Sequence, residues 1–211
     1  MTEKETYTRE IIKRLEKAYP DAKIALNFSN PLELLVAVIL SAQSTDTGVN
    51  KLTPALFRKY RTAEEYADAD ISELEQLIHS AGFYHNKAKS IKGAARFIVD
   101  DFGGEIPRTM EDITRLPGVA RKTGNIVLYN AFGVTGGIAV DTHVRRVSQR
   151  LGLSDNEDPE KIEKDLMTVV PRKKWGSFPY LLIELGRDVC TARKAYHDRC
   201  VLKDICPSAN I

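Results

Sequence analysis

The stretch Leu116-Pro-Gly-Val-Ala-Arg-Lys-Thr-Gly-Asn125 predicts a tight turn between two helices. Pro117-Gly118 is a turn signal, and the second helix is predicted over residues 120–132 because a glycine follows it. Arg121 and Lys122 fall in the first turn of that helix, where the helix dipole disfavours cations. Either they are two solvated surface cations, or the helix start receives an anion or holds a lysine in its neutral form.

Helical signals continue along almost the whole chain. Residues 31–40 are apolar nearly all round, with Glu33 as the only charge, so this helix should be buried. Asp46 and Asp141 are predicted helix caps, and 138–140 is predicted as a short buried extended segment. Apolar periodicity predicts further helices over residues 3–17, 70–82, 86–100, 141–151, 158–171 and 177–188. Three more helices are predicted to begin at residues 46, 62 and 109. No convincing pair of strands appears, so the predicted fold class is all-α.

Composition and charge narrow the protein class. The chain has 211 residues and a formal net charge of +2, so any nucleic-acid-binding surface must be a local basic patch. No stretch approaches the roughly 20 apolar residues of a membrane span, and the charged N-terminus lacks a signal-peptide core. We therefore expect a soluble cytoplasmic protein, associated with the nucleoid and without membrane contact.

The three cysteines lie together near the C-terminus. They are Cys190, Cys200 and Cys206, and an odd, clustered set in an intracellular chain favours metal ligation over disulfides. With His197 they form the pattern Cys-x6-His-x2-Cys-x5-Cys. A set of three cysteines and one histidine is also a normal structural zinc site.

Four motifs together resemble one known family. Leu116–Thr123 resembles the helix–hairpin–helix of the endonuclease III family of base-excision DNA glycosylases, and Val140–Val144 resembles its aspartate motif. Leu40–Asp46 and Gly82–Ala88 resemble its two DNA-probing loops, in the family's order. The resemblance implies two helical lobes, one over 23–135 that ends in the hairpin, and one from 1–22 with 136–211. The implied partner is damaged double-stranded DNA, bound by a monomer.

The resemblance implies a bifunctional enzyme that removes oxidised pyrimidines and cleaves the abasic site. Lys122 falls at the nucleophile, whose amine must be neutral, although a lysine in water is almost fully protonated at neutral pH. Partial burial, the helix start and neighbouring Arg121 should all favour the neutral amine. Asp141 is implied as the catalytic carboxylate, facing Lys122 across the interlobe cleft, and this role is compatible with a simple N-cap.

Further residues are implied as DNA contacts. Gln43 would insert into the duplex, and Phe83 stands where the family usually has an aliphatic wedge; alternatively, Gln43 caps a helix and Phe83 is a core residue. Ala120 replaces the hairpin's usual second glycine, and its methyl group could hinder the approach of a phosphate. His143 is either a DNA contact or a packing residue. The remaining expected phosphate contacts are Asn86, Lys87, Gly118, Arg121, Arg193 and Lys194.

The cysteine pattern resembles the family's ligands for a [4Fe-4S] cluster. The family has four cysteines spaced Cys-x6-Cys-x2-Cys-x5-Cys, so His197 replaces the second ligand here. Imidazole can ligate iron in iron–sulfur centres and tends to raise their potential. We therefore expect a [4Fe-4S] cluster held by Cys190, His197, Cys200 and Cys206, with zinc or no metal as the alternatives.

Two other functions remain open. One is a monofunctional mismatch or adenine glycosylase, against which Lys122 argues, as does the short tail after the last cysteine. The other is a non-catalytic protein that binds DNA through the hairpin alone.

Overall fold

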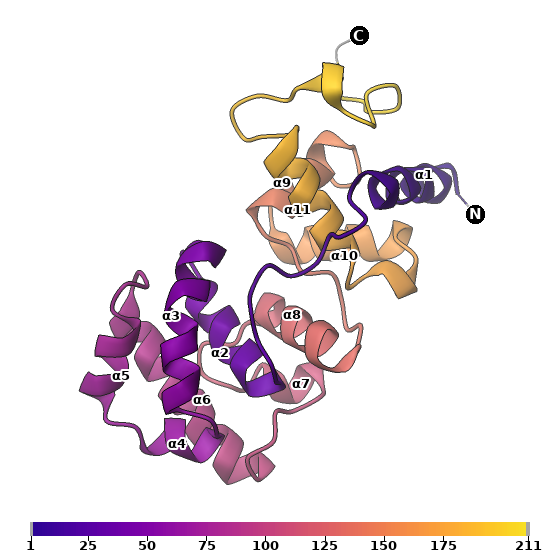
Figure 1. Ribbon diagram of the computed structural model, residues 1–211. Coiled ribbons are helices and arrows are strands. Elements are labelled where there is room, and N and C mark those ends of the chain that lie inside the picture. The colour runs from indigo at the N-terminus through magenta and orange to yellow at the C-terminus, as the bar shows by residue number, and fades with distance from the viewer. Residues whose placement is uncertain (1, 210–211) are drawn as a thin grey trace. The chain divides into compact units, whose positions relative to one another are not determined.

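The computed structural model describes residues 2–209, and these residues form an all-α fold (Figure 1). No named strand occurs among them, and a single isolated bridge joins Cys190 to Ala195. The fold class predicted from the sequence is confirmed. The helices are α1 (Glu3–Ala18), α2 (Pro31–Ser41), α3 (Asp46–Lys59), α4 (Ala63–Asp68), α5 (Ile71–Ile78), α6 (Tyr84–Phe102), α7 (Met110–Ile113), α8 (Arg121–Phe132), α9 (Thr142–Arg150), α10 (Pro159–Val169), η1 (Arg172–Lys174), α11 (Phe178–Asp188) and η2 (His197–Arg199).

The chain divides into two compact units. One is Ala25–Val134, and the other joins Met1–Ile24 to Thr135–Ile211. The sequence-based division was 23–135 and the remainder. Within the described residues, no helix has both the length and the apolar character needed to cross a membrane.

Helix α2 is the centre of the 25–134 unit. Asn30 begins it by accepting the N–H of Glu33 at 2.9 Å, with proline in the first turn. Every residue from Leu34 to Leu40 is buried, as the nearly continuous apolar pattern predicts. Helices α3, α6 and α8 pack around it (Figure 1). The two helices expected to carry DNA-contacting residues therefore rest on one buried helix.

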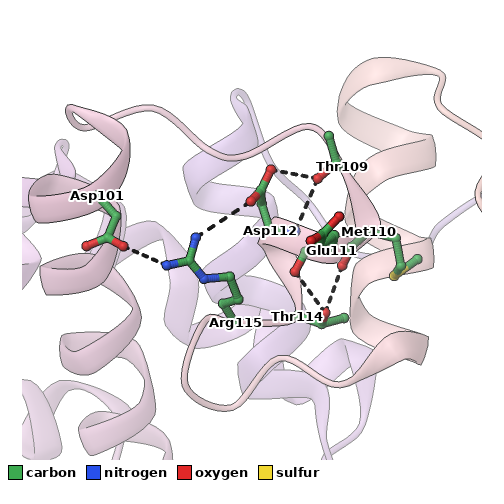
Figure 2. A network of polar contacts seen from close by, with 7 residues as sticks. All are labelled: Asp101, Thr109, Met110, Glu111, Asp112, Thr114 and Arg115. Carbon is green, nitrogen blue, oxygen red and sulfur yellow. Dashed lines mark hydrogen bonds and ion pairs between the residues drawn. The ribbon is translucent and has the colours of Figure 1, made fainter.

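The single turn α7 leads into the hairpin through a polar network (Figure 2). Thr109 caps it by accepting the N–H of Asp112 at 3.1 Å. Arg115 forms ion pairs with Asp101 at 2.8 Å and Asp112 at 3.7 Å, and its guanidinium lies 4.9 Å from the ring centre of Phe97. Because Arg115 immediately precedes Leu116, these contacts fix where the hairpin begins.

The second unit has its own core, formed by α1, α9, α10 and α11. Helices α9 and α11 approach closely at Gly186, where an added Cβ would lie 3.3 Å from the side chain of Val147. The predicted buried segment before α9 is present, since Ile138 is fully buried and Val140 is 6% exposed. The loop of the three cysteines packs against this core.

Two predicted helix starts differ from the structure. Thr45, not Asp46, caps α3, because its hydroxyl accepts the N–H of Gly48 at 3.1 Å. Helix α6 begins at Tyr84, two residues earlier than predicted, because Phe83 adopts a left-handed conformation that ends the preceding loop.

Candidate active site and DNA-contacting loops

The hairpin turn depends on Gly118 for two reasons. Its φ is +78°, which L side chains rarely adopt, and an added Cβ would lie 2.6 Å from the Cβ of Ser90 on α6. One turn further along α6, a Cβ on Gly93 would meet Pro117 at 3.3 Å. The hairpin is therefore seated directly on α6, through small residues on both sides.

Ala120 is the N-cap of α8 and fits the turn without strain. Its φ and ψ are −87° and 171°, an extended conformation that any residue adopts, and it is exposed. No side-chain hydrogen bond from Ala120 caps the helix. The alanine thus leaves the backbone path of the hairpin unchanged, and its methyl group affects only what approaches from outside.

Lys122 lies exposed in the first turn of α8. This corrects the expectation that partial burial within the protein would favour its neutral form. The turn that carries it is well held, because Gly124 lets α8 approach α7: an added Cβ would lie 2.9 Å from Met110 Sδ and 3.0 Å from Ile113. Lys122 is therefore a solvent-facing amine on a fixed backbone, next to Arg121.

Gln43 and Phe83 share an unusual backbone conformation. Their φ values are +53° and +58°, and no other non-glycine residue of the described chain has a positive φ. Such conformations cost about 1–2 kcal/mol each and are concentrated at functional sites. Both side chains are exposed, Phe83 by 65%, which contradicts the alternative that Phe83 is a core residue. Gln43 lies in the loop after α2, and its own side chain makes no helix cap there.

Lys87 has a different position from the one expected. It is only 5% exposed, and its ammonium donates to Leu40 O at 2.7 Å and to Ser44 Oγ at 2.8 Å. Burial lowers its pKa. The expected phosphate contact of Lys87 is therefore wrong, because the charged end points into the protein. Asn86, its neighbour, is exposed.

Asp141 is the N-cap of α9. Its Oδ1 accepts the N–H of Val144 at 2.8 Å, which confirms the predicted cap and uses one of the two carboxylate oxygens. His143 is half-buried, with Nδ1 3.3 Å from Nη2 of Arg146. A Cβ on Gly186 would approach the same ring at 3.1 Å, so packing already accounts for part of the position of His143.

Cys190, His197, Cys200 and Cys206 line one cavity beside Arg150. Nη1 of Arg150 donates to Cys190 Sγ at 3.3 Å. Burial raises the pKa of Cys200, and electrostatic interactions with Cys206 and Cys190 act in the same direction. Among the described residues, no three His, Cys, Asp or Glu side chains converge closely enough to hold a metal ion.

The basic residues of the cysteine loop are at the surface. Arg193 and Lys194 are both exposed. The ammonium of Lys194 lies 5.2 Å from the ring centre of Tyr196, which is itself exposed. The loop thus presents an aromatic ring with a cation over it.

Comparisons with known proteins agree with this geometry. Residues 36–172 match the model of the HhH-GPD superfamily base excision DNA repair protein. Endonuclease III of Synechocystis sp. (strain ATCC 27184 / PCC 6803 / Kazusa) is 52% identical over 209 residues, which are 99% of this chain and 95% of that protein. Endonuclease III of Bacillus subtilis (strain 168) is 47% identical over 89% of this chain and 86% of the relative. The chain belongs to the endonuclease III family.

A solved structure supports the same assignment. The fold is similar to that in the structure of a trapped endonuclease III–DNA covalent intermediate, with a TM-score of 0.92 and 42% identity over 99% of this chain and 98% of the other. As a member of the endonuclease III family, the protein is a base-excision-repair DNA glycosylase with lyase activity at abasic sites. Proteins of this family usually hold a [4Fe-4S] cluster.

Sequence reasoning missed two features of this endonuclease III-family chain. It placed Lys87 at the surface, although Lys87 lies one turn after Phe83 on the buried side of α6. It also missed the seat that Ser90 and Gly93 provide for the hairpin. The signal for that seat was the small-residue spacing from Ser90 to Gly93 on one face of a predicted helix.

Proposed function

We propose that the protein removes oxidised pyrimidines from duplex DNA and cleaves the resulting abasic site by β-elimination, with Lys122 as the nucleophile. The observation that carries this proposal is an exposed lysine in the first turn of a helix whose start is fixed by the hairpin and by Gly124. The neutral amine of Lys122 attacks C1′ of the deoxyribose, and the C1′–N bond breaks with its electron pair leaving on the base. Ring opening then gives a Schiff base at Lys122.

The Schiff base leads to strand cleavage. The imine withdraws electrons, so a base removes a proton from C2′ and the C3′–O bond breaks, with the phosphate as leaving group. Water then hydrolyses the imine and restores the lysine. Because Lys122 is exposed in the protein, DNA itself must cover the amine and desolvate it.

Asp141 acts on the same deoxyribose in this proposal. Its carboxylate opposes the positive charge that develops on the sugar and assists proton transfer. The N-cap hydrogen bond to Val144 orients the side chain, so the cap and the catalytic role support one another. A carboxamide in its place would keep the cap and lose the charge.

The two strained loops supply the side chains that replace the extruded nucleotide. Gln43 enters the duplex, and the exposed ring of Phe83 stacks on a neighbouring base. Positions of this kind must stay exposed without DNA, which is the state of both residues. The hairpin holds the DNA backbone through Gly118, Ala120 and Arg121. Asn86, His143, Arg193 and Lys194 are the further proposed contacts of a monomer on damaged double-stranded DNA.

The cysteine cavity is proposed to hold a [4Fe-4S] cluster through Cys190, His197, Cys200 and Cys206. The observation in support is that all four residues line one cavity. When bound, the cluster supplies a structural anchor for a loop that has little regular structure. The purified protein should then absorb near 400 nm (roughly, for an iron–sulfur centre).

Borohydride trapping tests the assignment of Lys122. The wild type should form a covalent adduct with a thymine-glycol duplex, and Lys122→Ala should lose it, whereas Lys164→Ala, at an exposed lysine of α10, should retain it. Trapping by Lys122→Ala would remove Lys122 from its role. A wild type that releases the base but leaves the abasic strand intact would instead favour the monofunctional glycosylase.

A further inference from the structure

Lys87 joins two segments that are far apart in the sequence. Its ammonium donates to Leu40 O in the last turn of α2 and to Ser44 Oγ in the Gln43 loop, which we define as residues 42–45. Its backbone N–H donates to Phe83 O at 3.1 Å, at the end of the Phe83 loop, residues 79–83. That backbone bond belongs to the first turn of α6, so the Lys87 side chain ties the Gln43 loop to the part of α6 that directly follows the Phe83 loop.

The two loops also approach each other directly. An added Cβ on Gly82 would lie 3.5 Å from the carbonyl oxygen of Gln43. Gln43 and Phe83 each hold a positive φ, and such conformations persist only where the surrounding structure enforces them. On the Gln43 side, the flanking bonds of Lys87 to Leu40 and Ser44 provide that enforcement.

Burying the charged lysine at this position carries a desolvation cost. Its charge is stabilised by the hydroxyl of Ser44 and by the carbonyl of Leu40, at the end of α2 where the helix dipole favours cations. Burial lowers its pKa, with no contribution from a nearby carboxylate. An apolar side chain of similar length would avoid the desolvation penalty, so packing alone does not explain a lysine here.

We propose that Lys87 is a positioning residue that clamps the Gln43 loop to the Phe83 loop, so that both side chains meet the duplex in one fixed arrangement. This inference rests on the proposed insertion of Gln43 and Phe83 and is independent of the nucleophile. Extruding a stacked, paired base requires both side chains to be in place, whereas a preformed abasic site has no base to extrude. The clamp therefore matters more for base excision than for strand cleavage at an existing abasic site.

The test compares two activities of the same active site. Lys87→Met keeps the side-chain length and removes both hydrogen bonds, and Lys59→Met makes the same change at an exposed lysine at the far end of α3. Single-turnover base excision on a thymine-glycol duplex should fall by about tenfold in Lys87→Met, and cleavage of a preformed abasic duplex by less than about twofold. The Lys59→Met control should change neither by more than about twofold.

Ser44→Ala provides a gentler variant if Lys87→Met folds poorly. It removes one acceptor and leaves the bond to Leu40, so base excision should fall by about threefold with cleavage retained. Equal losses of both activities in Ser44→Ala, or no loss of excision, would overturn the clamp. In either case borohydride trapping of the wild type still reports separately on Lys122.

A double-mutant cycle with Gln43 distinguishes positioning from general destabilisation. If Lys87 acts through the Gln43 loop, Lys87→Met should lower excision by only about twofold in a Gln43→Ala background, because the positioned side chain is already gone. A residue that merely stabilises the fold would lower excision by the same factor in both backgrounds. That additive result would contradict the proposal.

Discussion

Gly118→Ala should destabilise the 25–134 unit by steric conflict with the side chain of Ser90 on α6. An alanine at φ +78° costs about 1–2 kcal/mol, because its Cβ approaches the following carbonyl. The new Cβ would also lie 2.6 Å from Ser90 Cβ, which is fixed to the helix backbone and cannot rotate away. Overpacking of this kind costs about 1–3 kcal/mol, so the expected loss is about 2–5 kcal/mol.

Gly103→Ala separates the two contributions. Gly103 has φ +59° and no atom within 4 Å of an added Cβ, so its substitution should cost only the conformational part, about 1–2 kcal/mol. Ser90→Gly removes the obstructing atoms, at a cost of about 0.5 kcal/mol in helix propensity. In the double variant Gly118→Ala/Ser90→Gly, the summed loss should therefore shrink by about 1–3 kcal/mol.

Urea unfolding of the four variants and the wild type measures these differences. The reasoning would be refuted if Gly118→Ala cost no more than Gly103→Ala. It would also be refuted if adding Ser90→Gly to Gly118→Ala recovered no stability, since the close contact with Ser90 is the source of the loss beyond the conformational cost. Because the hairpin can again pack on α6 in the double variant, this variant should also recover the base excision that Gly118→Ala loses.

Three further predictions concern the loops, the carboxylate and the buried lysine. Phe83→Gly should raise the free energy of unfolding by up to about 1 kcal/mol, because glycine adopts φ +58° without strain at this exposed position. Base excision should fall in the same variant. A lower stability of Phe83→Gly in urea would contradict this. Asp141→Asn should keep the free energy of unfolding within about 0.5 kcal/mol because asparagine also caps helices, whereas Asp141→Ala should lose about 1 kcal/mol. Both variants should lose base excision, and an active Asp141→Asn would show that excision does not need the negative charge of Asp141. The free energy of unfolding of the wild type relative to Lys87→Met should rise with pH between the lowered folded-state pKa of Lys87 and about 10.4, because the unfolded state binds more protons in that window. Urea midpoints at several alkaline pH values measure this difference. A difference that stays constant with pH would contradict a buried charge at Lys87.

Local signals in the sequence predicted most of the helices. Asn30-Pro31 and Asp141 start helices as expected, and Gly133 ends α8 with φ +68°. These predictions succeed because a cap or a terminator acts within one turn of the backbone, over a few residues. The start of α6 was misplaced because the left-handed conformation of Phe83 is not a preference of phenylalanine but is imposed by the surrounding loops.

For the candidate site too, the sequence predicted the residue types, and the tertiary structure decided their surroundings. The motif around Lys122 and the spacing of Cys190, Cys200 and Cys206 named the residues to consider, but their surroundings depend on distant parts of the chain. Lys122 is exposed and Lys87 is buried, the reverse of what was expected for both. A lysine is normally at the surface, so only the packing of α2 and the Gln43 loop around Lys87 decides otherwise.

The sequence by itself determined the all-α fold, the glycine turn of the hairpin and the residues able to do chemistry, because these follow from side-chain type and short-range backbone preference. The tertiary structure alone decided the seat of Gly118 on Ser90, the shared cavity of the cysteines with His197, and the bonds of the Lys87 ammonium to Leu40 and Ser44. These arrangements depend on how whole helices pack, as in the contacts of Gly118 with Ser90 and of Lys87 with Leu40, which join segments far apart in the sequence.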